Sequence, residues 1–166
     1  MIKDNVGNIR IWRKGMKRSM VIVLLLTLIT SFASAGNVQK NDKQTGRLKV
    51  TIAGFENDEG KVKVGLFDSK EGYSSGKEPF RGFSVEIRGG KAECTFEGIP
   101  YGTYAIKAYH DKNGNGKLDT DFTGIPNEPY GFSNNARAEF GPAKWDDAKF
   151  TINSKNMTME IIVTAR

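Results

Sequence analysis

The sequence has very few of the residues that build disulfide frameworks and soft-metal sites, since it contains one cysteine and one histidine among 166 residues. A single cysteine excludes an internal disulfide, and the two residues together are too few for a typical zinc or copper centre. The fold must therefore be held by core packing, with any metal bound through oxygen atoms. Cys94 alternates with polar neighbours, which predicts a buried and unreactive thiol.

The folded part of the chain also lacks a strong net charge. The whole sequence carries +6, but residues 1–35 contain six basic residues against one acidic residue and account for +5. The remaining 131 residues are nearly neutral. An extended basic surface for nucleic acid is therefore not expected.

Long hydrophobic runs are scarce, and the clearest one covers residues 20–32. It is shorter than the roughly 20 residues that span a bilayer as a helix. Lys17 and Arg18 precede it, and the small residues 33–35 follow, which is the pattern of a secretory signal peptide. We expect cleavage after Ala35 and a mature protein without a transmembrane segment, exported to the periplasm or secreted.

After this signal, residues 36–46 are polar and aperiodic, which predicts a flexible leader. In residues 47–164 apolar positions mostly alternate with polar ones, the period of half-buried strands. About seven short strands without a convincing amphipathic helix predict an all-β domain. The expected architecture is an antiparallel β-sandwich of immunoglobulin-like or transthyretin-like type.

Turn residues between the strands predict two hairpins. One would join the strands at 47–52 and 61–66, and the other those at 83–87 and 92–96. Residues 110–147 show neither strand nor helix period, yet they are rich in aromatic residues and proline. We expect them to form one long ordered loop, and such loops in small domains are usually functional.

The most specific motif opens this loop, where residues 110–119 read HDKNGNGKLD. Asp111, Asn113 and Asn115 occur at every second position and Gly116 follows, as in the first half of an EF-hand loop. Side-chain oxygens at this spacing can converge on one cation while the glycine allows a sharp bend. The motif therefore predicts calcium binding.

The second half of the motif departs from the EF-hand pattern. Its twelfth position holds Phe122 instead of a bidentate glutamate, so the missing oxygens must come from Asp119, Asp121 or Glu128. A surface turn rich in asparagine and glycine, without metal, is the alternative. The predicted calcium ligands are Asp111, Asn113, Asn115, the backbone carbonyl of Lys117, Asp119 and Asp121.

Aromatic residues gather in the rest of the loop, among them Tyr130, Phe132 and Trp145. They can pack the loop onto the sandwich, or they can form a recognition surface for a carbohydrate or an envelope protein. Both interpretations stay open at the level of sequence.

Three separate strings are similar to those of the bacterial family catalogued as domain of unknown function 2141. They are GIPYGTY at 98–104, the decapeptide at 110–119, and GIPNEPYGFSNN at 124–135, followed by FGP at 140–142. The resemblance covers about residues 47–164. It implies a small, exported, all-β domain of Gram-negative bacteria and brings no established activity.

The residue inventory favours a protein that is not an enzyme. A serine triad could use only His110, with Ser133 as nucleophile and Asp121 as acid, and no Gly-x-Ser-x-Gly string is present. We therefore expect an exported, calcium-binding structural or recognition module of the cell envelope. The alternatives are a structural module without metal, or a carbohydrate-active hydrolase that uses carboxylates of the 111–147 loop, namely Asp119, Asp121, Glu128, Asp146 and Asp147.

Overall fold

The structure, a computed structural model, describes residues 44–139 and 141–165. These residues form eight strands in two sheets, with two short helices and one 3-10 turn between strands. No helix in the described part of the chain is long and apolar enough to cross a membrane. The expected signal peptide and most of the expected leader lie outside the described residues.

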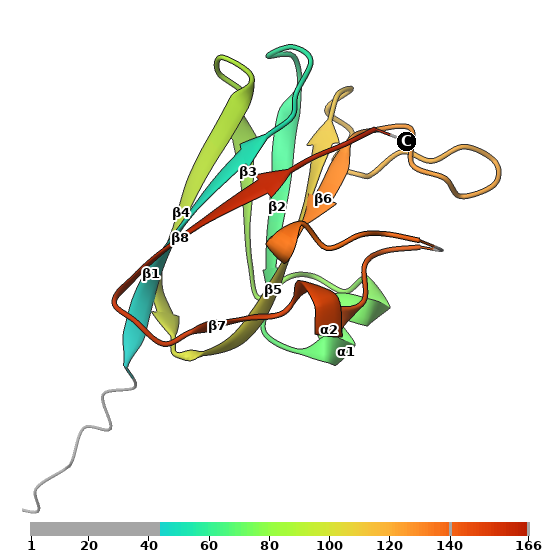
Figure 1. The fold of residues 1–166 in the computed structure, drawn as a ribbon. Coiled ribbons are helices and arrows are strands. Elements are labelled where there is room, and N and C mark those ends of the chain that lie inside the picture. Colours follow the sequence, from blue (N-terminus) through green and yellow to red (C-terminus); the bar gives the residue numbers. More distant parts are fainter. Residues whose placement is uncertain (1–43, 140, 166) are drawn as a thin grey trace, which may run out of the picture. The chain divides into compact units, whose positions relative to one another are not determined.

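The smaller sheet has three strands in the order β4-β1-β8 (Figure 1). The larger sheet has the order β3-β2-β5-β6, and β7 pairs with the first residues of β5. The smaller sheet consists of β1 (Thr45–Ala53), β4 (Lys91–Pro100) and β8 (Asn156–Ile162). The larger sheet consists of β2 (Lys61–Phe67), β3 (Arg81–Glu86), β5 (Gly102–Asp111), β6 (Tyr130–Phe132) and β7 (Phe150–Ile152).

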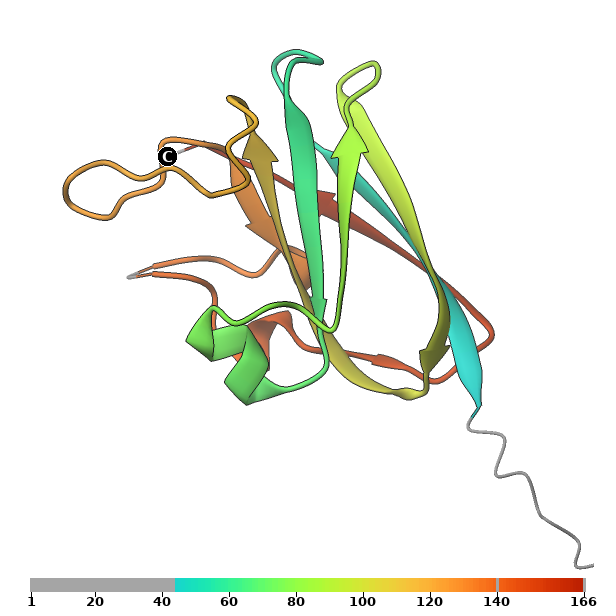
Figure 2. The ribbon, with the colours of Figure 1, turned by 180° about the vertical axis from the view of Figure 1, so that it is seen from behind.

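The two sheets pack face to face around one main core, which confirms the predicted β-sandwich (Figure 2). Alternate residues of each strand point inward, as the period of two requires. Leu48 and Ile52 of β1 meet Val62 and Leu66 of β2 in this core, and all four side chains are fully buried. Burial of such side chains contributes about 1.5–3 kcal/mol each to folding.

The first predicted hairpin is wrong, and of the second only the turn forms, with one antiparallel bridge between Arg88 and Lys91. β1 pairs with β4 and β8, whereas β2 pairs with β3 and β5, so the turn at residues 54–60 connects the two sheets. The turn between β3 and β4 also crosses from one sheet to the other. Asp58 links these two turns, because its carboxylate accepts hydrogen bonds of 2.8 Å from the backbone N–H groups of Gly89 and Gly90. These two hydrogen bonds hold the pKa of Asp58 below its usual value.

The expected antiparallel arrangement also has one exception, because β1 runs parallel to β8. The other named strand pairs are antiparallel. β1 begins at Thr45, two residues earlier than the expected start of the domain, since Thr45 and Gly46 pair with Pro100 and Ile99.

The segment 110–147 is not one continuous loop. It contains the end of β5, strand β6, the 3-10 turn η1 (Ser133–Asn135) and the helical turn α2 (Trp145–Ala148). A second apolar cluster forms where η1 and α2 meet α1 (Lys70–Ser75), around Phe67 and Tyr73. The sequence shows no period here because each element is only three to six residues long.

Cys94 points into the main core from β4, with 8% of its surface exposed. Burial raises the pKa of its thiol to about 12. We expect negligible labelling by iodoacetamide at neutral pH in native buffer and complete labelling in denaturant, measured by intact mass. Stoichiometric labelling of the native protein would contradict the described register of β4.

Candidate functional site

The candidate site begins where β5 ends, at Asp111. This residue lies on the last position of β5 opposite Lys61 of β2, and only 1% of it is exposed. The loop that follows folds back over it, so that Asp111 Oδ2 accepts a 3.0 Å hydrogen bond from the backbone N–H of Gly116. Gly116 has a φ of +78°, a conformation that glycine adopts without strain.

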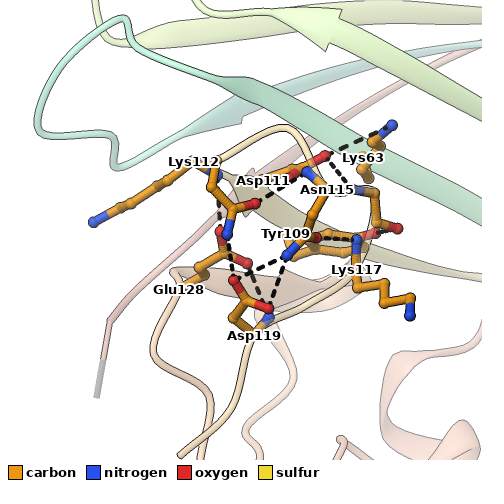
Figure 3. Close-up of polar contacts among 10 residues, drawn as sticks. Lys63, Tyr109, Asp111, Lys112, Asn115, Lys117, Asp119 and Glu128 are labelled. Carbon is orange, nitrogen blue, oxygen red and sulfur yellow. Dashed lines mark hydrogen bonds and ion pairs between the residues drawn. The ribbon is translucent and has the colours of Figure 1, made fainter.

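Two asparagine side chains shape the loop between these residues, and Asn115 is labelled in Figure 3. Asn113 Oδ1 accepts from the N–H of Asn115 at 3.0 Å, and Asn115 Oδ1 accepts from the N–H of Lys117 at 2.8 Å. Both contacts are Asx turns, which these residue types favour. The amide groups of both asparagines also reach Asp119, at 2.6–3.1 Å. Three of the predicted ligands are thereby brought together.

Glu128 closes the loop from the other side. It is 4% exposed and lies just before β6. Its carboxylate accepts from the N–H of Lys112 at 2.8 Å and from the N–H of Asp119 at 3.0 Å. Because these two residues lie near the start and at the end of the motif, Glu128 fixes the distance across it (Figure 3).

Asp121, by contrast, belongs to a neighbouring turn. Its Oδ1 accepts from the hydroxyl and N–H of Thr123 and from the N–H of Ile125, at 2.6–3.0 Å. The Thr123 hydroxyl and these backbone groups hold the pKa of Asp121 below its usual value. Asp121 Oδ1 therefore holds the 121–125 turn.

The charges around the loop are of both signs. Asp111, Asp119 and Glu128 contribute three carboxylates, and the nearest ammonium is Lys63 Nζ, 3.7 Å from Asp111 Oδ2. Burial, together with the charges of Asp111 and Glu128, raises the pKa of Tyr109. Lys112 and Lys117 also lie on the loop, so three ammonium groups share this region with three carboxylates, and Lys63 is the one paired with Asp111.

One atom of the site has no partner. Within the described residues, Asp111 Oδ1 is buried and accepts no hydrogen bond. Also within that part of the chain, no three side chains of His, Cys, Asp or Glu are placed to hold a metal ion by themselves. A cation here would therefore need the asparagine and backbone oxygens in addition to the carboxylates.

The arrangement does not assemble the serine triad that the sequence left open. Ser133 is fully buried; its Oγ accepts from the N–H of Ile106 at 2.8 Å and donates to the carbonyl of Ala148 at 2.6 Å. His110 points into the core, where its Nε2 lies 2.7 Å from the Glu59 carbonyl. These contacts leave no hydrogen-bonded pair of nucleophile and base between the two residues.

The three aromatic residues that the sequence singled out are mainly packing residues. Phe132 is 5% exposed and contacts Tyr130 at a ring-centroid distance of 5.8 Å. Trp145 packs edge-on against Tyr73 at 5.7 Å. All three belong to or pack against the second apolar cluster. Tyr130 and Phe132 nevertheless also line a hollow on the outer face of the larger sheet.

Comparison with known proteins places the chain in a family. The model of a bacterial family described as "Uncharacterized protein conserved in bacteria (DUF2141)" matches residues 50–160. The chain belongs to this family. The match includes β2 to β7, the second half of β1 from Val50, most of β8, and the whole 111–128 site.

No curated protein matches the chain. Among solved structures it is similar to a cysteine-to-alanine mutant of a pilus-presented adhesin, Spy0125 (Cpa), at 15% identity. The match covers 74% of this chain and 27% of the adhesin chain, with a TM-score of 0.23. So low a score carries no argument about structure or function.

Proposed function

We propose that this DUF2141 domain is an exported calcium-binding module of the bacterial cell envelope. The ion would be held by Asp111, Asn113, Asn115 and Asp119, with Glu128 as the closing carboxylate and Lys117 contributing its backbone carbonyl. The observation that carries the proposal is the buried Asp111 Oδ1, which has no hydrogen-bond partner in the described residues.

A buried carboxylate oxygen without a partner is costly, because removing a charged group from water is repaid only by hydrogen bonds or an opposite charge. The Lys63 ammonium lies 3.7 Å from the other oxygen of Asp111 and compensates the charge only in part. A divalent cation bound at Oδ1 would supply the missing interaction.

The donor set favours calcium over other cations. Carboxylate, amide and carbonyl oxygens are hard ligands, and Ca²⁺ accepts six to eight of them in flexible geometry. Magnesium prefers a smaller octahedral shell that keeps several waters. Two of the first three ligand positions are neutral asparagines, so a modest affinity is expected, of about 0.1–1 mM as in extracellular calcium modules.

The test is a thermal melt of wild type and of two matched variants, in about 2 mM calcium and in chelator. Wild type is expected to melt about 2–8 °C higher in calcium. Asp111→Asn is expected to lose that rise, because it removes the charged first ligand but keeps an oxygen for the Gly116 N–H. Asp121→Asn is the control and should keep the rise, since asparagine can preserve the 121–125 turn.

Two results would contradict the proposal. One is a wild-type melt that is identical in calcium and chelator. The other is equal loss of the rise in both variants, which would indicate a diffuse response to acidic charge rather than binding at Asp111. Metal analysis of natively purified protein measures the same property independently.

The observed contacts do not favour the hydrolase alternative. Asp121 Oδ1 accepts from the N–H of Ile125, and Asp146 pairs with Lys70 and Lys149 at 3.1 and 2.7 Å. Chromogenic glycosides remain the direct test of that activity.

A further inference from the structure

The outer faces of the two sheets differ in character. On the smaller sheet, charged residues of β1 and β4 pair with each other, as in Arg47 with Glu97 at 3.0 Å and Lys49 with Glu93 at 2.9 Å. On the larger sheet, the outward positions of β2, β5 and β6 form the floor of a cavity of about 590 Å³. The outer face of the smaller sheet thus carries paired charges, whereas the outer face of the larger sheet contains a cavity.

This cavity continues into a second one of about 1040 Å³, and both are lined by Leu118, Tyr130, Phe132 and Pro142. We call the two together the outer groove. Pockets for single small molecules usually measure 300–1,000 Å³. The outer groove is therefore large enough for an oligomeric ligand.

The floor of the outer groove contains a row of four residues on neighbouring strands. The register places Ser84 opposite Lys63, Lys63 opposite Tyr109, and Tyr109 opposite Tyr130. A hydroxyl, an ammonium and two half-buried aromatic rings thus follow one another across the sheet. The first cavity is also lined by Lys77, Lys107 and Glu78, and the second by Glu139, so the described lining of the outer groove has three lysines and two carboxylates.

We propose that the outer groove binds an anionic oligosaccharide, with sugar rings on Tyr109 and Tyr130 and a carboxylate at Lys63, and that calcium tightens this binding. The part that concerns calcium rests on the proposed function above. Charge complementarity favours an anion, and the aromatic rings favour a ligand with flat apolar faces.

An extended peptide fits the same floor less well. Peptides that bind to sheets gain affinity from main-chain hydrogen bonds to a free strand edge. β2 is paired with β3 and β5, and β5 is paired with β2 and β6, so a peptide could pair only at the outer edges of β3 or β6 and not over Lys63 and Tyr109. A sugar needs no such edge.

Two contacts connect the outer groove to the calcium loop. Tyr109 Oη donates a 2.7 Å hydrogen bond to the Gly116 carbonyl, and Lys63 Nζ lies 3.7 Å from Asp111 Oδ2 (Figure 3). Calcium bound to Asp111 would repel the Lys63 ammonium and release it toward the groove. By thermodynamic linkage the anionic sugar should then also raise the affinity for calcium.

The experiment is calorimetric titration of the full domain with hyaluronan hexasaccharide, in calcium and in chelator. The matched ligand is the same hexasaccharide with its carboxylates reduced to alcohols. We expect the charged form to bind at least about tenfold more tightly than the reduced form. Its affinity should rise about fivefold or more in calcium, the lower end of typical coupling between sites.

Lys63→Gln and Lys61→Gln form a matched pair on β2, because Lys61 does not line the outer groove. Lys63→Gln should abolish the preference for the charged hexasaccharide and raise calcium affinity about tenfold, since no ammonium then competes for Asp111. Lys61→Gln should have little effect on the preference for the charged over the reduced hexasaccharide. A merely structural role of Lys63 would not raise calcium affinity.

The possible failures can be told apart. Calcium binding without hexasaccharide binding in either buffer overturns this inference and leaves the proposed function intact. Absence of calcium binding overturns the proposed function and the coupling between calcium and saccharide. The titration in chelator then decides by itself whether the outer groove prefers the charged hexasaccharide. If hexaglutamate binds as tightly as the charged hexasaccharide or more tightly, the ligand of the outer groove is an acidic peptide and the saccharide proposal is wrong.

Discussion

Glu128→Gln is expected to lower the free energy of unfolding by about 1–3 kcal/mol in chelator and to remove most of the stabilisation by calcium. The buried carboxylate accepts two backbone N–H groups, from Lys112 and Asp119. A glutamine can accept only one of these bonds with its oxygen, because its amide nitrogen is a donor. One N–H group is then left facing another donor at the point that closes the loop.

The measurement is urea unfolding of the variant and wild type, in chelator and in calcium. Glu97→Gln is the control, because Glu97 forms an exposed ion pair with Arg47 and such pairs contribute about 0–1 kcal/mol. If Glu128→Gln is as stable as wild type in chelator, the two described N–H contacts do not hold the loop. If the variant keeps the full calcium response, Glu128 is not the closing ligand.

Ser133→Ala is expected to have the largest effect on stability, a loss of about 2–4 kcal/mol that lowers the melting temperature by roughly 10 °C. The substitution leaves the Ile106 N–H and the Ala148 carbonyl without their buried partner. Each such group costs about 1–3 kcal/mol when it is unsatisfied away from water.

Ser75→Ala is the matched control, because its hydroxyl is exposed and makes one 3.4 Å contact with the Gly72 carbonyl. Thermal melts in chelator compare the two variants without the calcium contribution. Equal stability of Ser133→Ala and wild type would show that Ser133 does not join β5 to the residue that ends α2. That result would also reopen the question of a reactive hydroxyl at this position.

Local patterns in the sequence were sufficient for the strands other than β6 and for the first half of the site, but not for α1, η1 or α2. Alternation of apolar and polar residues depends only on which side of a strand faces the core, so Leu48 and Val62 could be assigned inward before any pairing was known. The Asx turns of Asn113 and Asn115 involve residues two apart, so the motif itself contains the information for them.

Only the tertiary structure decided which strands pair. Alternation is the same for a strand in either sheet and in either direction, so it could not distinguish a β1–β2 hairpin from two strands in opposite sheets. The parallel pairing of β1 with β8 joins residues more than 100 positions apart. Such contacts depend on loop closure and on packing across the whole domain.

The same limit applies to the site. The sequence offered Asp119, Asp121 and Glu128 as sources of the missing oxygens, and only the fold brings Glu128 back to the N–H groups of Lys112 and Asp119. The burial of Asp111 likewise arises because the loop folds over the end of β5. The sequence by itself determined which residues carry side-chain oxygens, whereas the long-range packing of β5 and β6 decided which of them lie close together.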